Sequence, residues 1–227
     1  MNAKQRSWSG AALAAVMVPV VIGLLACLPV PIGDPERSSI DPDLTGMWVL
    51  LGDGPGAVVL LEPYDKRSWL MTSVHLESGA DSDDLDIESY EDLIELLEQE
   101  DENESGVSAV HMLMYKVWRT RLGNHWFMTW EGKGQFDEDR GFEPEIWFAM
   151  RIQKAGPDKF TLRLINPDFD GFDDIKETRR AFEKVIKKNS DNDDMYLDDD
   201  DMTFIRVRPE HHEMFNDVLN ELVGEDV

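Results

Sequence analysis

The sequence predicts a mainly β protein with flanking helices (α+β), in which an antiparallel meander closes, fully or partly, into a barrel. Three observations predict this class. Apolar, β-branched and aromatic runs follow one another in pairs separated by short polar turns, which is typical of hairpins. No helical crossover separates the runs that would pair, so a parallel sheet is not expected. A long meander also tends to curl and close, because closure removes its edges.

A first strand and three hairpins account for residues 44–166. The first strand follows Leu44 and ends at GDGPG, residues 52–56, a composition typical of turns. The hairpins join AVVLLEPY to RSWLMTSVHLE, SAVHMLMYKVWRTR to HWFMTWEGK, and EIWFAMRIQK to KFTLRLIN. Because side chains alternate along a strand, Trp126, Met128 and Trp130 share one face.

Apolar residues at helical spacing predict three helices outside these strands. The first, at about 86–99, is an insertion within residues 81–104, which hold 13 acids and no base. The second spans about 173–188 and ends near Asn189. The third begins at Pro209, after a last strand in MTFIRVR. Their apolar stripes are Ile87, Tyr90, Ile94 and Leu97 in the first, Ile175, Phe182, Val185 and Ile186 in the second, and Phe215, Val218, Leu219 and Leu222 in the third.

The segment LTGMW, Leu44 to Trp48, resembles the Gly-x-Trp signature that opens lipocalin-like barrels, with Gly46 and Trp48 at the two matching positions. The resemblance extends to the strand order across residues 44–166. It implies a barrel in which Trp48 packs across a closed end, and the helical insertion departs from the simple eight-strand pattern of that family. The alternative is that Trp48 is an ordinary core aromatic of another antiparallel sheet.

The first residues have the pattern of a secretory signal peptide. Lys4 and Arg6 precede an apolar run, AALAAVMVPVVIGLLA, which ends in small residues before Cys27. A transmembrane helix needs about 20 apolar residues, and this run is interrupted by Pro19 and Gly23. A retained membrane helix is therefore the less favoured interpretation.

LLAC, Leu24 to Cys27, resembles the lipobox of bacterial lipoproteins. This resemblance implies cleavage between Ala26 and Cys27, acylation of Cys27 with palmitate-like chains, and attachment to a membrane through that lipid anchor. Leu28, rather than Asp, follows the cysteine, which by the rule of enteric bacteria implies the outer membrane, facing the periplasm. Cys27 is the single cysteine, so no disulfide partner exists for it. An ordinary signal peptide with a cysteine near the cut is the alternative.

This interpretation divides the chain into three parts: a signal peptide (1–26), a lipidated Cys27 with a flexible, Pro-rich tether (27–43), and one β-rich domain (44–227). Without Lys4 and Arg6, 20 basic residues face 47 acidic ones, a net charge of −27. Such a charge argues against nucleic acid and against anionic lipid headgroups as partners. It favours cations or basic partners.

The sequence contains few signs of a catalytic or metal-binding site. Motifs for a serine nucleophile, a phosphate-binding loop or a dinucleotide are absent, so neither an enzyme nor a cofactor is expected. His75, His111 and His125 lie on or beside predicted strands without metal-ligand spacing. DNDDMYLDDDD, residues 191–201, has the acids of a calcium loop, but Tyr196 and Met202 replace the Gly and Glu that an EF-hand needs. A solvated acidic loop is expected, with weak divalent-ion binding as the alternative.

Aromatic and methionine side chains make the strands apolar on both faces, which fits either a filled barrel with helices outside or a cavity for an apolar ligand. We expect a non-enzymatic lipoprotein that binds a small apolar molecule or an envelope partner. The alternatives are a structural or assembly lipoprotein that uses its acidic surface, and a metal-assisted hydrolase.

The helix at 86–99 is expected to be a surface helix, with a lid or a partner surface as alternatives. The candidate pocket residues are Trp48, Trp69, Met71, Met112, Met114, Trp126, Met128, Trp130, Phe148 and Met150.

Overall fold

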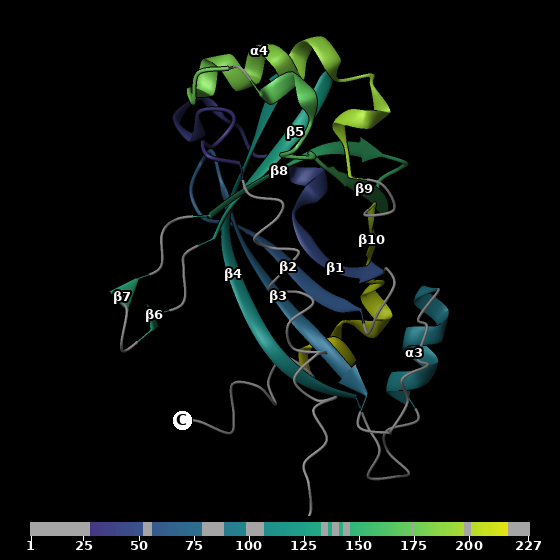
Figure 1. Ribbon diagram of the computed structural model, residues 1–227. Coiled ribbons are helices and arrows are strands. Elements are labelled where there is room, and N and C mark those ends of the chain that lie inside the picture. The colour runs from purple at the N-terminus through teal and green to yellow at the C-terminus, as the bar shows by residue number, and fades with distance from the viewer. Residues whose placement is uncertain are drawn as a thin grey trace, which may run out of the picture.

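Eight antiparallel strands form a closed barrel in the computed structural model of the protein. The structure describes residues 28–51, 56–78, 89–98, 107–132, 136–137, 141–142, 146–173, 175–197 and 201–217. Each barrel strand pairs with the next one along the chain, and the last pairs with the first (Figure 1). The strands are β1 (Gly46–Leu51), β2 (Ala57–Pro63), β3 (Trp69–Ser78), β4 (Val107–Leu122), β5 (His125–Gly132), β8 (Ile146–Lys154), β9 (Lys159–Leu164) and β10 (Met202–Arg206).

The predicted closed antiparallel meander is thus confirmed, and so are its three hairpins, β2–β3, β4–β5 and β8–β9. One small element was not predicted. The chain between β5 and β8 carries a separate two-stranded sheet, β6 (Phe136–Asp137) and β7 (Gly141–Phe142). Residues 52–55 of the predicted GDGPG turn lie outside the described residues.

Two α-helices interrupt the barrel sequence. The insertion between β3 and β4 contains α3 (Tyr90–Glu98), as predicted, although residues 86–88 and 99 lie outside the described ranges. The helix predicted at about 173–188 is wrong at its start, because α4 spans Arg179–Asn189. Thr178 accepts the backbone N–H of Ala181 and caps α4 there. Short 3-10 helices are η1 (Pro35–Arg37), η2 (Pro42–Leu44), η4 (Asp170–Phe172), η5 (Asp193–Met195) and η6 (Pro209–His211).

The last helix begins as predicted, with Pro209 in the first turn of η6 and helical residues 212–217 after it. Phe215 is buried, whereas Val218, Leu219 and Leu222 lie outside the described residues. Among the described helices, none is both long enough and apolar enough to cross a membrane.

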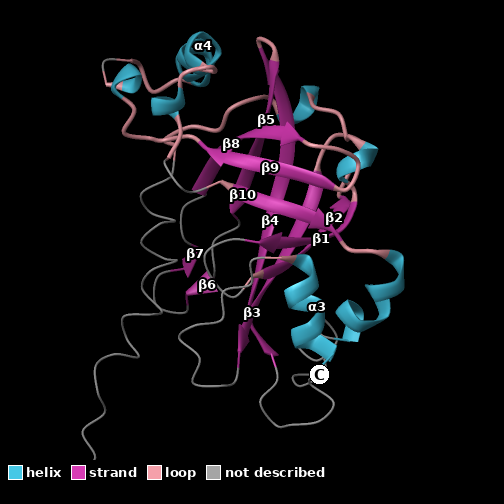
Figure 2. Ribbon diagram, turned by 90° about the vertical axis from the view of Figure 1, so that its right-hand side faces the viewer, coloured by secondary structure: helices cyan, strands magenta, loops and turns pink. Residues whose placement is uncertain are grey.

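Three apolar clusters explain why the strands are apolar on both faces. One fills the barrel interior, and two lie outside it under covering elements. On one outer side α3 and Phe215 cover Val49, Val58 and Leu76. On another, α4 and residues 28–32 cover Phe127 of β5 and Ala149 of β8. In both views α3 and α4 lie far apart, on different sides of the barrel (Figures 1 and 2).

The segment that precedes the barrel is not the flexible tether that the sequence predicts. Leu28 and Ile32 are buried, and the Leu28 N–H donates to the Trp147 carbonyl at 3.0 Å. The Ile32 carbonyl accepts hydrogen bonds from Trp118 Nε1 at 2.9 Å and from the Thr129 hydroxyl at 2.8 Å. The prediction rested on the Pro-rich composition, but Leu28 and Ile32 pack with Phe127 in an apolar cluster outside the barrel.

Candidate functional site

One end of the barrel is covered by residues that precede β1, because Ile40 and Leu44 pack on the interior cluster to which Trp48 belongs. Trp48 Nε1 donates to the Leu44 carbonyl at 3.0 Å, and Leu44 is itself buried in the interior cluster. The Arg206 guanidinium stacks 4.1 Å from the centre of the Trp48 ring and donates to the Thr45 carbonyl at 3.0 Å. Gly46 has a positive φ of 129°, and a Cβ there would lie 2.8 Å from the Arg206 guanidinium. The glycine and the tryptophan of Gly-x-Trp therefore belong to one close-packed unit.

The interior next to this end is filled by aromatic rings. The rings of Trp48 and Phe160 meet edge to face at 4.7 Å, and Phe160 stacks on Phe204 at 4.6 Å. Seven of the ten candidate pocket residues point into the barrel. Trp48, Trp69, Met71, Met128 and Met150 are buried there, and Trp130 and Phe148 are partly buried. Of the two interpretations of the apolar strands, this half of the barrel matches a filled core.

The other three candidate pocket residues are placed elsewhere, and the prediction is wrong for them. Met112 and Met114 are 51% and 52% exposed, because they alternate with inward-facing Tyr115 and Val117 and so point out of β4. Trp126 is 37% exposed and lies under the Arg119 guanidinium, 4.4 Å from its ring centre. These side chains belong to the outer surface and to the rim of the covered end.

Toward the far end of the barrel the interior aromatic side chains are only partly buried. Tyr115, Trp130 and Phe148 pack on the interior cluster, with 5.5 Å between the ring centres of Tyr115 and Trp130. Trp130 Nε1 is buried, yet it has no hydrogen-bond partner among the described residues. A buried donor without an acceptor is uncommon in folded proteins, so Trp130 offers an unused hydrogen-bond donor on the interior side of β5.

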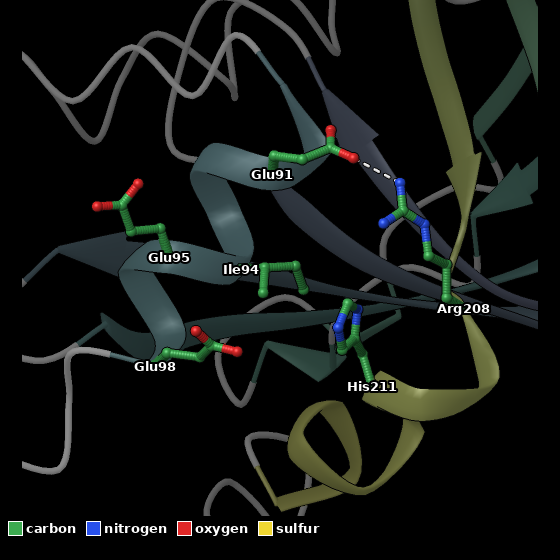
Figure 3. A pocket seen from close by; sticks show the side chains of 6 residues that line it. All are labelled: Glu91, Ile94, Glu95, Glu98, Arg208 and His211. Atoms are coloured by element: carbon green, nitrogen blue, oxygen red, sulfur yellow. Dashed lines mark hydrogen bonds and ion pairs between the residues drawn. The ribbon is translucent and has the colours of Figure 1, made fainter.

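A charged groove of about 320 Å³ lies outside the barrel, between α3 and η6 (Figure 3). Arg208 and His211 line it from the C-terminal side, and the Arg208 guanidinium forms an ion pair with Glu91 of α3. The α3 side chains Ile94, Glu95 and Glu98 complete its wall. The groove combines a histidine with carboxylates, which are the side chains of many reactive and metal-binding sites.

The geometry of the groove favours a structural link. The Arg208 N–H donates to the Tyr90 hydroxyl at 3.2 Å, and the same hydroxyl lies 2.8 Å from His211 Nδ1. Burial raises the pKa of Tyr90 above its usual value, so the hydroxyl keeps its proton at neutral pH. Tyr90 thus joins α3 to the C-terminal segment.

The other histidines do not converge on one site. His75 and His111 are partners in the β3–β4 register, but His125 lies at the opposite end of β4, next to Leu122. His125 Nε2 is 2.8 Å from a carboxylate oxygen of Asp191. Within the described ranges no group of three or more histidines, cysteines or acids could hold a metal ion.

The Asp-rich segment is tied to the barrel by ion pairs. Arg163 contacts Asp193 at 2.8 Å and Asp201 at 3.1 Å, and its guanidinium stacks 4.6 Å from the Tyr196 ring centre. These carboxylates raise the pKa of Arg163 further above its ordinary value. Tyr196 itself is buried. Asp191, Asp193 and Asp201 thus each have a protein partner, and residues 198–200 lie outside the described ranges.

Ala26 and Cys27, the predicted cleavage and acylation site, also lie outside the described residues. The described residues begin at Leu28, and Gly33 is bound by α4. The Arg179 guanidinium donates to the Gly33 carbonyl at 3.1 Å, and Glu183 accepts the Gly33 N–H at 2.9 Å. The predicted acylation site is therefore one residue away from a segment that is fixed to the domain.

Comparison with known proteins adds no relative. No family model, no curated protein and no solved structure matches the chain.

Proposed function

We propose that this chain is a lipid-anchored protein of the bacterial envelope, attached through acylated Cys27 and facing the periplasm from the outer membrane. The lipobox-like LLAC supports the anchor, and Leu28 in place of Asp supports the outer membrane. The observation that carries the proposal is the order of features at the N-terminus: an apolar leader, one cysteine, and then at once a segment bound to the domain. Several acyl chains hold a protein firmly on a membrane without any further contact.

The barrel of such a protein works best as a rigid platform for contacts with an envelope protein. The stacked rings of Trp48, Phe160 and Phe204 fill the covered half of the interior as an ordinary core. Outside, Met112 and Met114 are half exposed on the outer face of β4, and methionine adapts its shape to varied partners. The arrangement around Gly46 and Trp48 also supports the likeness to lipocalin-like barrels.

Intact mass spectrometry tests the anchor. The full chain is expressed in a Gram-negative host, and the membrane-bound form is purified. The expected mass is that of residues 27–227 plus acyl chains, while the Cys27→Ser variant keeps its leader. A wild-type chain that carries no acyl group, or that is cut elsewhere, contradicts the anchor.

A second candidate function is the binding of a small apolar molecule at the far end of the barrel. The unpartnered Nε1 of Trp130 favours it, since a ligand oxygen would satisfy that donor. Native mass spectrometry of the purified protein, followed by lipid extraction, is the test. A bound molecule lost from Trp130→Phe, which keeps an aromatic ring without the N–H, supports this function. A wild-type protein that stays free of ligand after incubation with envelope lipids contradicts it.

A further inference from the structure

The positive charge of this acidic protein is concentrated on α4. Six of the 20 basic residues that follow Cys27 lie between positions 176 and 188, together with two acids, Glu177 and Glu183. Glu183 is engaged by the backbone of Gly33. The basic residues are Lys176, Arg179, Arg180, Lys184, Lys187 and Lys188, and all six are exposed.

Helix geometry sorts these charges into two sides of α4. Phe182 and Ile186 are buried against the barrel, and Arg179 lies beside them on Gly33. At about 100° per residue, Arg180, Lys184, Lys187 and Lys188 fall on the side opposite the buried one. A groove of about 500 Å³ runs along this outer side and the turn before it, with an apolar floor that includes Ile175 and Val185 between Lys176, Arg180, Lys184 and Lys188.

The same helix is held close to the predicted anchor. Gly33 is bound directly by α4. Gly33 is five positions after Leu28, a span of at most about 18 Å, and Cys27 is one residue further. Since Leu28 and Ile32 are buried, no length of free chain separates the domain from a lipid on Cys27. A membrane that holds this cysteine therefore lies near α4.

From this juxtaposition we propose that the outer side of α4 rests on anionic lipid headgroups of the membrane that holds Cys27. The proposal rests on the lipid anchor proposed above, and it gives the anchored barrel a fixed orientation. Lysine and arginine near an anionic surface contribute about 1 kcal/mol each, which is about fivefold in binding. Their aliphatic stems suit the apolar floor of the groove while the charges reach the phosphates. The net charge of −27 argues against such contact for the molecule as a whole, but not for this side of α4.

Lysine footprinting on the full-length, membrane-purified protein tests this contact. The protein is reconstituted into vesicles of phosphatidylcholine alone or with 30% phosphatidylglycerol, and a water-soluble amine reagent is applied. We expect the labelling of Lys176, Lys184, Lys187 and Lys188 to fall at least about threefold on the anionic vesicles. Lys66 and Lys159, which are exposed on other elements, keep their reactivity. The protection disappears in 1 M salt, where the Debye length is about 3 Å.

A pair of matched variants sharpens the test. Lys184→Gln with Lys188→Gln reduces the protection of Lys176 and Lys187, whereas Lys66→Gln with Lys159→Gln leaves it unchanged. Equal labelling on both vesicle types, or protection that survives high salt, overturns the proposal. Protection seen only in native envelope membranes and not on protein-free anionic vesicles also overturns it, in favour of a protein partner.

Failure of the anchor is recognised separately. The intact mass of the same preparation shows whether Cys27 carries acyl chains. If it does not, the labelling is repeated with an excess of anionic vesicles added to the free protein. Protection of the α4 lysines there still supports the lipid contact, and unchanged labelling refutes it.

Discussion

Replacing Gly33 with alanine tests whether the N-terminal segment is truly fixed to the barrel. Gly33 has a φ of +73°, and a Cβ at this position would lie 2.6 Å from the Cβ of Thr120. A left-handed conformation costs an alanine about 1–2 kcal/mol, and an overpacked contact costs about 1–3 kcal/mol more. Since the Cβ of Thr120 cannot move without its backbone, we expect Gly33→Ala to lower the free energy of unfolding by about 2–5 kcal/mol.

Detaching the N-terminal segment from the barrel would relieve this strain, but it would itself cost free energy. Release would give up two hydrogen bonds to the Ile32 carbonyl, worth about 1 kcal/mol each. It would also expose Leu28 and Ile32, whose burial is worth about 1.5–3 kcal/mol each. Both routes therefore lead to a measurable loss of stability.

The assay is urea unfolding followed by tryptophan fluorescence, with Gly156→Ala as the matched control. A Cβ at Gly156 meets no atom within 4 Å, so the same substitution is nearly neutral there. With a slope of about 2 kcal/mol/M, the midpoint for Gly33→Ala falls by at least about 1 M. Equal midpoints for the two variants would refute the docked segment.

Three further predictions concern contacts outside the barrel and at its covered end. Tyr90→Phe removes the hydroxyl between α3 and η6 and is expected to cost about 1–2 kcal/mol; an unchanged unfolding free energy contradicts that link. Arg206→Lys keeps the charge but not the flat stack on Trp48, so we expect a loss of about 1–3 kcal/mol in thermal or urea unfolding, whereas full stability would argue against the stacked unit. Burial alone would raise the pKa of Asp41, but a hydrogen bond from Lys154 and nearby positive charge hold it below the ordinary value. This stabilisation is present above the unfolded pKa and lost as the pH falls through the folded one, so Asp41→Asn should destabilise the protein at pH 7 and have less effect near pH 2; an equal effect at both pH values is the contrary result.

The barrel could be predicted from local patterns. Alternating apolar residues and short polar turns mark each hairpin, and Gly46 with Trp48 marks the covered end. The same alternation of side chains was not applied when the candidate pocket residues were chosen. Met112 and Met114 share the outward face of β4, opposite Tyr115, so the rule that placed Trp126, Met128 and Trp130 together excludes both methionines from the interior.

The docked N-terminal segment could not be predicted in this way. Its proline-rich sequence has no period, and the partners that hold Ile32 lie far along the chain: Phe127 packs in the same apolar cluster, and Trp118 and Thr129 donate to its carbonyl. The basic side of α4 is different, since Lys176, Arg180, Lys184 and Lys188 recur every four residues in the sequence. The net charge of the chain does not reveal that pattern, because the excess of acidic residues elsewhere in the sequence is much larger.

The most direct test of the docked anchor segment is hydrogen exchange at residues 28–33 in the membrane-bound protein. The Leu28 amide donates to Trp147 and the Gly33 amide donates to Glu183. We predict that both exchange as slowly as barrel amides and that Gly33→Ala accelerates them. Exchange at the rate of an unstructured peptide would mean that a flexible tether separates the barrel from the membrane, which would contradict the account.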